Sequence, residues 1–219
     1  MLSDVRAASD ARLREVRVYV DDLAKQDQGR PVAIRTGFTA AKGLFFVHLY
    51  GALEYTVTQA VQRAIQSINQ SSPSFRDLKA AFFSIALDSE CKAVAAVGPT
   101  KVWPKRWELF ERTVSGDAVH ISDAVFPADG FNLKIVQMES VWRSFCLPGS
   151  VVPKPELRGR LDELAENRNR IAHGRESATS VGSRYSTDDL RIRLTDIDGY
   201  CSYVIQTFDA YLTGRDYIA

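Results

Sequence analysis

The residues best suited to chemistry lie near the end of one expected helix, over residues 156–173. The apolar stripe of this helix consists of Leu157, Leu161, Leu164 and Ile171. Arg168 falls near the middle of that stripe, where helical periodicity favours a leucine. A guanidinium in such a position must meet a carboxylate, backbone carbonyls or a bound anion, because an unpaired buried charge is costly. Asn169 and His173 are four residues apart and are therefore neighbours on a second face of the helix.

These three side chains together supply groups that phosphodiester chemistry uses. Arg168 offers a fixed positive charge, Asn169 an amide, and His173 an imidazole that can change its charge near neutral pH. An imidazole can act as a general acid or base, and a cation can stabilise the charge that develops on a phosphate. Taken alone, a histidine in the place of His173 is more often a helix-terminal cap than a catalyst, and Asn169 alone indicates nothing. The functional prediction therefore depends on the combination.

An ion pair with another helix is the main structural alternative for Arg168. Glu54 is the candidate partner, because it interrupts an apolar run on the long helix expected over residues 39–69, much as Arg168 interrupts its own stripe. That run consists of Val47, Val61 and Ile65. Such a pair is compatible with catalysis, since the carboxylate of Glu54 would orient the guanidinium.

The string RNRIAHG, from Arg168 to Gly174, resembles the R-N-x-x-x-H signature of the HEPN superfamily. The flanking strings LDELAENR and AHGRES extend the likeness, as does the place of this helix before a long C-terminal amphipathic helix. The string FVHLYGALEYTVTQAV, residues 46–61, resembles an early helix of HEPN proteins from bacterial defence and toxin systems. The resemblance covers roughly residues 39–212, and the short motif is its specific part.

The resemblance implies a metal-independent endoribonuclease without a cofactor, acting as a homodimer whose two motif helices form one composite site. His173 would act as general base or acid at the RNA 2′-OH or the leaving oxygen, and Arg168 would stabilise the phosphorane. Asn169 would hold the phosphate or orient His173. The products would be a 2′,3′-cyclic phosphate and a 5′-hydroxyl. A defence or toxin role implies that an antitoxin or another defence protein is a partner.

Further RNA contacts are expected from residues close to the motif. These are Arg170, Arg175 and Arg184, which could bind phosphates, and Tyr185, which could stack on a base or donate a hydrogen bond. Taken singly, each of them is more typical of a solvated loop.

Two other function classes are weighed against the enzyme. A HEPN-like bundle without catalysis would serve as a dimerisation module or a nucleotide- or RNA-binding module, although a pure scaffold has no need of a titratable histidine. A DNA-binding regulator is disfavoured, because no helix-turn-helix with a basic recognition helix is recognisable. Trp103, Trp107 and Trp142 are expected to be core or interface anchors rather than base-stacking platforms.

Helical patterns dominate the chain and predict an all-α fold. Helices are expected over residues 3–25, 39–69, 75–96, 103–113, 132–147, 156–173 and 187–213. The segment 114–130 is irregular, either a small hairpin or a loop, and residues 175–186 are expected to be a polar loop. We expect a HEPN-like helical bundle of four to five main helices with short connecting loops. It would be one domain over residues 1–219, with an N-terminal helix and linker over 1–30 and the bundle core over 31–219.

The composition excludes several classes of protein. Lys and Arg number 28 against 27 Asp and Glu, so the formal net charge of +1 requires any nucleic-acid contact to come from a local patch. Three isolated cysteines and three scattered histidines lack the spacing of a disulfide framework or a zinc site. The first residues lack the apolar segment of a secretory signal, and the longest apolar run, residues 44–53, is too short to span a membrane. We therefore expect a cytoplasmic protein.

Overall fold

The computed structural model describes residues 1–27, 35–126 and 132–219, and their regular structure is helical. In these ranges there is no strand, only isolated bridges between Ser74 and Ala118 and between Leu78 and Ile218. The predicted all-α fold is confirmed. No helix in the described part of the chain is long and apolar enough to cross a membrane.

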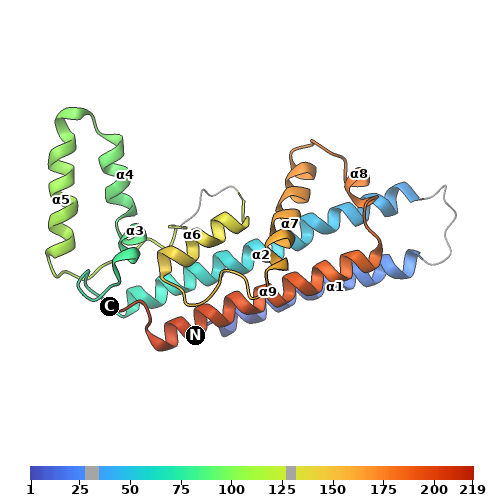
Figure 1. Ribbon diagram of the computed structural model, residues 1–219, viewed down its shortest axis with the longest axis horizontal. Coiled ribbons are helices and arrows are strands. Elements are labelled where there is room, and N and C mark those ends of the chain that lie inside the picture. The colour runs from blue at the N-terminus through green and yellow to red at the C-terminus, as the bar shows by residue number, and fades with distance from the viewer. Residues whose placement is uncertain (28–34, 127–131) are drawn as a thin grey trace.

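Three long helices lie side by side and form the main body of the fold (Figure 1). They are α1 (Ser3–Asp27), α2 (Arg35–Gln70) and α9 (Thr187–Gly214). Helix α1 buries one stripe, which consists of Val5, Ser9, Leu13, Val16, Val20 and Leu23. Its helical spacing places these side chains on one face, and that face packs against α2 and α9. The first helix therefore completes this core.

A short polar contact lies inside this apolar body. The hydroxyls of Ser9 and Thr56 are 2.7 Å apart, and Thr56 also donates to the carbonyl of Ala52 at 2.8 Å. Both side chains are buried. A buried polar group is tolerated only when it is hydrogen-bonded, so this pair favours one register of α1 against α2.

The last helix begins at Thr187, as predicted. Ser186 is its N-cap: the hydroxyl accepts from the backbone N–H of Asp189 at 3.1 Å, and the Asp189 carboxylate accepts from the backbone N–H of Ser186 at 2.9 Å. This reciprocal capping box fixes where the chain enters α9. It uses an aspartate where the more familiar pattern has a glutamate.

Helix α7 (Glu156–Ala172), which carries the motif, crosses α2 and contacts α9 (Figure 1). After α7 the chain forms a short helix, α8 (Ala178–Gly182), so the prediction of a polar loop over residues 175–186 is wrong in this part. Helix α8 lies directly on α2 at two glycines. A Cβ atom at Gly43 would overlap the carbonyl of Ala178, and one at Gly182 would overlap the carbonyl of Thr39. This close approach holds the segment after the motif against the bundle.

The single helix expected over residues 75–96 is broken into three pieces. They are the 3-10 turn η2 (Ala80–Phe82), α3 (Phe83–Ala86) and α4 (Asp88–Ala96). Phe82 and Ile85 are buried in the core, whereas α4 has no buried residue. The chain changes direction at Leu87, whose backbone is not helical at φ −108° and ψ 17°, because the apolar side chains before this point are buried and those after it leave the core.

The remaining helices are α5 (Val102–Val114), which follows the 3-10 turn η3 (Pro99–Lys101), and α6 (Ile135–Phe145). The described part of the irregular segment is a loop, not a hairpin. Asn69 fixes it, because its amide donates to the carbonyl of Ile121 at 2.7 Å and accepts from the N–H of Ile121 at 2.9 Å. The rest of the predicted irregular segment, residues 127–130, lies outside the described residues.

Candidate functional site

Arg168 lies where α7 crosses α2, on the face of an aromatic ring. Its guanidinium carbon is 4.6 Å from the centre of the Tyr50 ring. Its Nη1 atom donates to the amide oxygen of Asn169 at 2.8 Å, with a longer contact of 3.4 Å to the amide oxygen of Asn132. The side chain is half-buried. The guanidinium is therefore held by neutral groups: one ring face and two amides.

Tyr50 is itself fixed by its hydroxyl group. The ring is 1 % exposed, and the hydroxyl accepts from the backbone N–H of Leu133 at 2.8 Å and donates to Glu54 at 3.3 Å. Burial raises the pKa of this phenol, so it stays protonated at neutral pH. The proposed direct ion pair between Arg168 and Glu54 is not formed. Tyr50 and Glu54 are four residues apart on one face of α2. Arg168 contacts the ring of Tyr50, and the Tyr50 hydroxyl contacts Glu54, so Tyr50 lies between the guanidinium and the carboxylate.

The other arginines of α7 form ion pairs with carboxylates. Arg158 pairs with Glu139 at 2.8 Å, Arg160 with Asp196 at 2.9 Å, and Arg170 with Glu176 at 2.7 Å. Within the described residues, Arg168 is the arginine of this helix without a carboxylate partner. Its positive charge is therefore not neutralised by an acidic side chain of residues 1–27, 35–126 or 132–219.

Asn169 lies in the last turn of α7, His173 is the C-cap residue that follows the helix, and the two differ in exposure. Asn169 is 7 % exposed, and its backbone carbonyl accepts a hydrogen bond from the backbone N–H of His173 at 3.0 Å. His173 is exposed, and its imidazole makes no hydrogen bond to any residue that the structure describes. The helix ends because Gly174 follows in the left-handed region, at φ +66°, which glycine adopts without strain. The structure thus joins Arg168 to Asn169 and presents His173 to solvent one turn further on.

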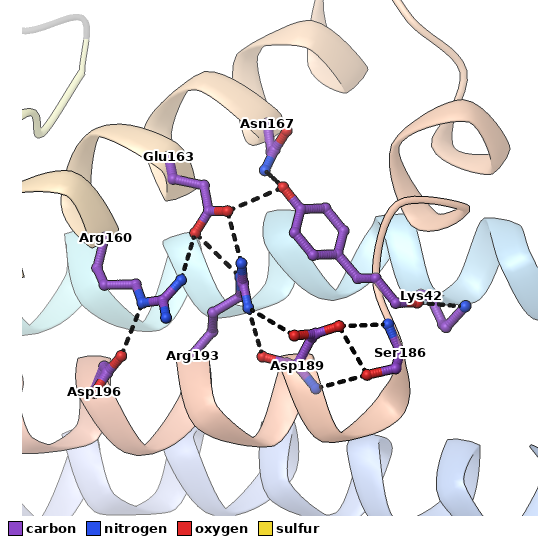
Figure 2. Close-up of polar contacts among 9 residues, drawn as sticks. Lys42, Arg160, Glu163, Asn167, Ser186, Asp189, Arg193 and Asp196 are labelled. Atoms are coloured by element: carbon purple, nitrogen blue, oxygen red, sulfur yellow. Dashed lines mark hydrogen bonds and ion pairs between the residues drawn. The ribbon is translucent and has the colours of Figure 1, made fainter.

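A polar cluster beside the motif connects α7 to α9 (Figure 2). The hydroxyl of Tyr185 accepts from the amide of Asn167 at 2.9 Å and donates to Glu163 at 3.1 Å. Arg193 binds Glu163 through two nitrogens, at 2.8 Å and 3.1 Å, and its guanidinium lies 4.5 Å from the centre of the Tyr185 ring. The backbone carbonyl of Tyr185 accepts from Lys42 at 2.5 Å. Tyr185 is therefore part of the contact that positions α7.

Glu163 is the centre of this cluster. Burial alone would raise the pKa of its carboxyl, but hydrogen bonds and charge from Arg193, with further hydrogen bonds from Tyr185 and Arg160, outweigh burial and lower it. Arg160 also reaches Asp196 on α9, as Figure 2 shows. Sequence reasoning did not identify Glu163, Asn167 or Arg193. The available signal was their spacing: Glu163 and Asn167 are four residues apart and project from one face of α7.

A HEPN domain family model matches residues 1–217 of the chain. The chain belongs to the HEPN family. HEPN domains are typically ribonucleases, so RNA is the substrate class that the family suggests. No curated protein and no solved structure matches the chain.

The candidate RNA contacts around the HEPN motif fall into two groups. Arg170 pairs with Glu166 at 3.0 Å as well as with Glu176, and Arg184 also pairs with Glu176. The hydrogen bond from Arg170 lowers the pKa of Glu166, which keeps this carboxylate charged. Arg175 is exposed and has no ion pair within the described residues. Of the arginines predicted to bind phosphate, Arg175 is thus the one not already engaged by a described carboxylate.

A resident metal ion would need several ligands close together. Among the residues that the structure describes, no three His, Cys, Asp or Glu side chains gather in a group that could hold one. The groups that this HEPN chain presents near its motif are the guanidinium of Arg168, the amide of Asn169 and the imidazole of His173. With those groups it can bind an anion, stabilise negative charge and transfer a proton.

Proposed function

We propose that this HEPN chain is a metal-independent endoribonuclease that cleaves RNA by transesterification at a composite site of a homodimer. Its biological setting would be a bacterial defence or toxin–antitoxin system, in which an antitoxin or another defence protein restrains the activity. The proposal combines the family's typical activity with the placement of three motif residues.

The observation that carries the proposal is the environment of Arg168. A half-buried guanidinium that faces an aromatic ring and two amide oxygens keeps its full charge for an incoming anion. A bidentate carboxylate partner would instead have neutralised most of that charge, as it does for Arg193. Keeping a half-buried guanidinium without a carboxylate partner costs free energy, and binding of a phosphate would offset that cost.

The reaction follows from these positions. The imidazole of His173 removes the proton of the RNA 2′-OH, and the 2′ oxygen forms a bond to the adjacent phosphorus. Arg168 stabilises the negative charge of the phosphorane. The 5′ oxygen then leaves and takes a proton from an imidazolium, which gives a 2′,3′-cyclic phosphate and a 5′-hydroxyl. Asn169 is a positioning residue in this scheme, because its amide oxygen holds Arg168 at 2.8 Å.

A second copy of the chain supplies what one copy lacks. One protomer has a single His173, whereas the reaction needs a base for the 2′-OH and an acid for the leaving oxygen. The exposed position of His173 at the end of α7 supports an approach by the same helix of a partner across a two-fold axis. Each phosphate would then lie between two imidazoles and two guanidiniums.

Cleavage assays with matched variants test the enzyme. Purified protein is incubated in excess EDTA with a panel of single-stranded and structured RNAs. We expect cleavage by the wild type, loss of at least about 100-fold in His173→Ala, and full activity in His120→Ala, which removes an exposed histidine far along the chain from the motif. Equal rates for wild type and His173→Ala, or no cleavage of any RNA, would overturn the proposal and leave a non-catalytic dimerisation or RNA-binding module.

Mixed dimers test the shared site, and growth tests the biological role. A dimer with one Arg168→Ala protomer and one His173→Ala protomer retains one guanidinium and one imidazole. Each variant homodimer lacks one of these two kinds of group entirely, so the mixed dimer should recover part of the activity. Full activity in a monomer would exclude the composite site. Growth arrest on expression, relieved by His173→Ala, is the result expected for a toxin.

A further inference from the structure

A two-helix hairpin formed by α4 and α5 projects from one end of the molecule, away from α7 (Figure 1). The two helices contact each other, and neither has a single buried residue. Short isolated helices are marginally stable in water, and helices in proteins are stabilised mainly by burying an apolar face. The hairpin therefore lacks the packing that the other long helices receive from this chain.

The exposed side of α5 is aromatic. It carries Trp103, Trp107, Phe110 and Val114, whose exposed fractions are 59, 61, 66 and 64 %. Together with Cys91 and Val94 of α4 and Leu109, the three aromatic side chains line a groove of about 460 Å³. A contiguous patch of exposed aromatic side chains on α5, continued by Cys91 and Val94 of α4, is characteristic of a contact surface. We refer to this groove and the α5 stripe as the aromatic face.

We propose that the aromatic face binds the same face of a second copy of the chain, with the two α5 helices antiparallel. The spacing of the stripe is four, three and four residues, which reads identically in both directions along the helix. A two-fold contact requires such a self-complementary surface. In the antiparallel arrangement Trp107 packs against the partner's Phe110 at the centre of the seam, and Trp103 packs against the partner's smaller Val114 at each end.

The size of the face fits this occupant. Aromatic side chains bury roughly 150–250 Å² each, so covering the exposed parts of three of them in each of two copies removes about 700 Å² from water. The groove residues of α4 and the edges of α5 add to this area. The total approaches the roughly 1,000 Å² that a specific protein contact needs.

The charges of the hairpin favour protein over RNA as the occupant. Its basic side chains are largely paired within the hairpin: Lys92 with Asp88, Lys105 with Glu108, and Arg112 with Glu90. Arg106 lies 5.0 Å from the centre of the Trp103 ring. A surface that binds single-stranded RNA combines aromatic rings with a groove of unpaired positive charge. Here most of the positive charge is paired with carboxylates, and apart from Arg106 the groove beside the rings has an apolar lining.

This contact is separate from the pairing of α7 in the proposed function, since the hairpin and α7 lie at different places along the long helices (Figure 1). Two different two-fold contacts on one chain link dimers into a tetramer when they close and into longer assemblies when they do not. When α7 pairing of the proposed function also holds, the native mass of the wild type should therefore exceed that of a dimer.

Light scattering of purified full-length protein tests the contact. We expect Trp107→Glu to lower the native mass, to a dimer if α7 pairing holds and to a monomer if it does not, so the two proposals fail separately. Val136→Glu places the same charge at an exposed valine of α6 and should leave the mass unchanged. RNA cleavage per protomer should also be unchanged in Trp107→Glu. Equal masses for wild type and Trp107→Glu overturn the proposal, and a loss of RNA binding instead would assign the face to RNA.

Disulfide cross-linking tests the antiparallel register in a Cys91→Ser background. A mixture of Trp103→Cys and Val114→Cys protomers should cross-link, because the antiparallel seam brings these two positions together. Each variant alone should not, because identical positions then lie about 16 Å apart along the helix axis. Cross-linking of each variant alone, or of no combination, contradicts the antiparallel contact.

Discussion

The guanidinium of Arg168 lies over the face of the Tyr50 ring, 4.6 Å from the ring centre. The relationship joins the motif helix α7 to the buried interior of α2, because Tyr50 is itself fixed by the backbone of Leu133 and by Glu54. A cation over a desolvated ring gains free energy without losing its charge to a carboxylate. The contact therefore fixes where the positive charge of the site is placed and leaves that charge available to a phosphate.

Substitutions at Tyr50 separate this placement from folding. Tyr50→Leu removes the ring face, and the loss of about 2 kcal/mol of interaction predicts cleavage reduced by roughly 10- to 30-fold. Tyr50→Phe keeps the ring but leaves the N–H of Leu133 unsatisfied, so it should lower the free energy of unfolding by about 1–3 kcal/mol while cleavage persists. Single-turnover rates and urea unfolding measure the two effects. An equal loss of cleavage in both variants would show that the ring is not what positions Arg168.

Glu163 makes the stability of the fold depend on pH. Its pKa in the folded protein is lowered, so its contribution is present above the ordinary carboxyl pKa and is lost as the pH falls through the lowered value. We expect Glu163→Gln to lower the free energy of unfolding by about 1–2 kcal/mol at pH 7, a figure reduced for partial exposure. The difference from wild type should shrink below about pH 4.

Urea unfolding of both proteins between pH 3 and 7 measures this dependence. Glu139→Gln is the matched control, because Glu139 also pairs with an α7 arginine but at an exposed site, where a salt bridge contributes little. A difference between Glu163→Gln and wild type that stays constant with pH would contradict the assignment.

The long helices could be predicted from the sequence because each has an apolar stripe at helical spacing. The same logic found Arg168, since a cation within such a stripe demands a partner. It could not identify that partner. Tyr50 and Glu54 are four residues apart on one face of α2, and only the depth at which α7 crosses α2 places the ring, not the carboxylate, against Arg168.

The segment after the motif shows a second limit. Helix α8 has five residues, too few for a periodic pattern, and its position depends on the close approach of Gly43 and Gly182 to backbone carbonyls. A glycine in a sequence indicates a break as readily as a backbone contact. The tertiary contact that distinguishes these cases involves residues more than 100 positions apart, and local spacing carries no information about it.

The cysteines should differ sharply in reactivity. Cys201 is buried, and burial raises the pKa of its thiol to about 12, whereas Cys91 is exposed. Because the thiolate is the reactive form, native protein should be alkylated at Cys91 and spared at Cys201 until it unfolds. Peptide mass spectrometry after iodoacetamide treatment, in the Trp107→Glu variant so that the aromatic face is uncovered, measures both sites. Native alkylation of Cys201 at a rate similar to Cys91 would mean that the bundle of α1, α2 and α9 opens readily.

Two glycines of α2 provide a matched test of the contact with α8. Gly43→Ala adds a Cβ that overlaps the carbonyl of Ala178, so α8 must shift, and we expect the free energy of unfolding to fall by about 2–3 kcal/mol. Gly51→Ala adds the same atom in open space within the same helix and should raise it by up to about 1 kcal/mol, because alanine is the better helix former. Urea unfolding measures both changes.

If α8 also holds the end of the motif helix in place, Gly43→Ala should reduce RNA cleavage at temperatures where the variant is still folded, while Gly51→Ala leaves it unchanged. Stabilisation by both substitutions would mean that α8 does not pack on α2 in solution.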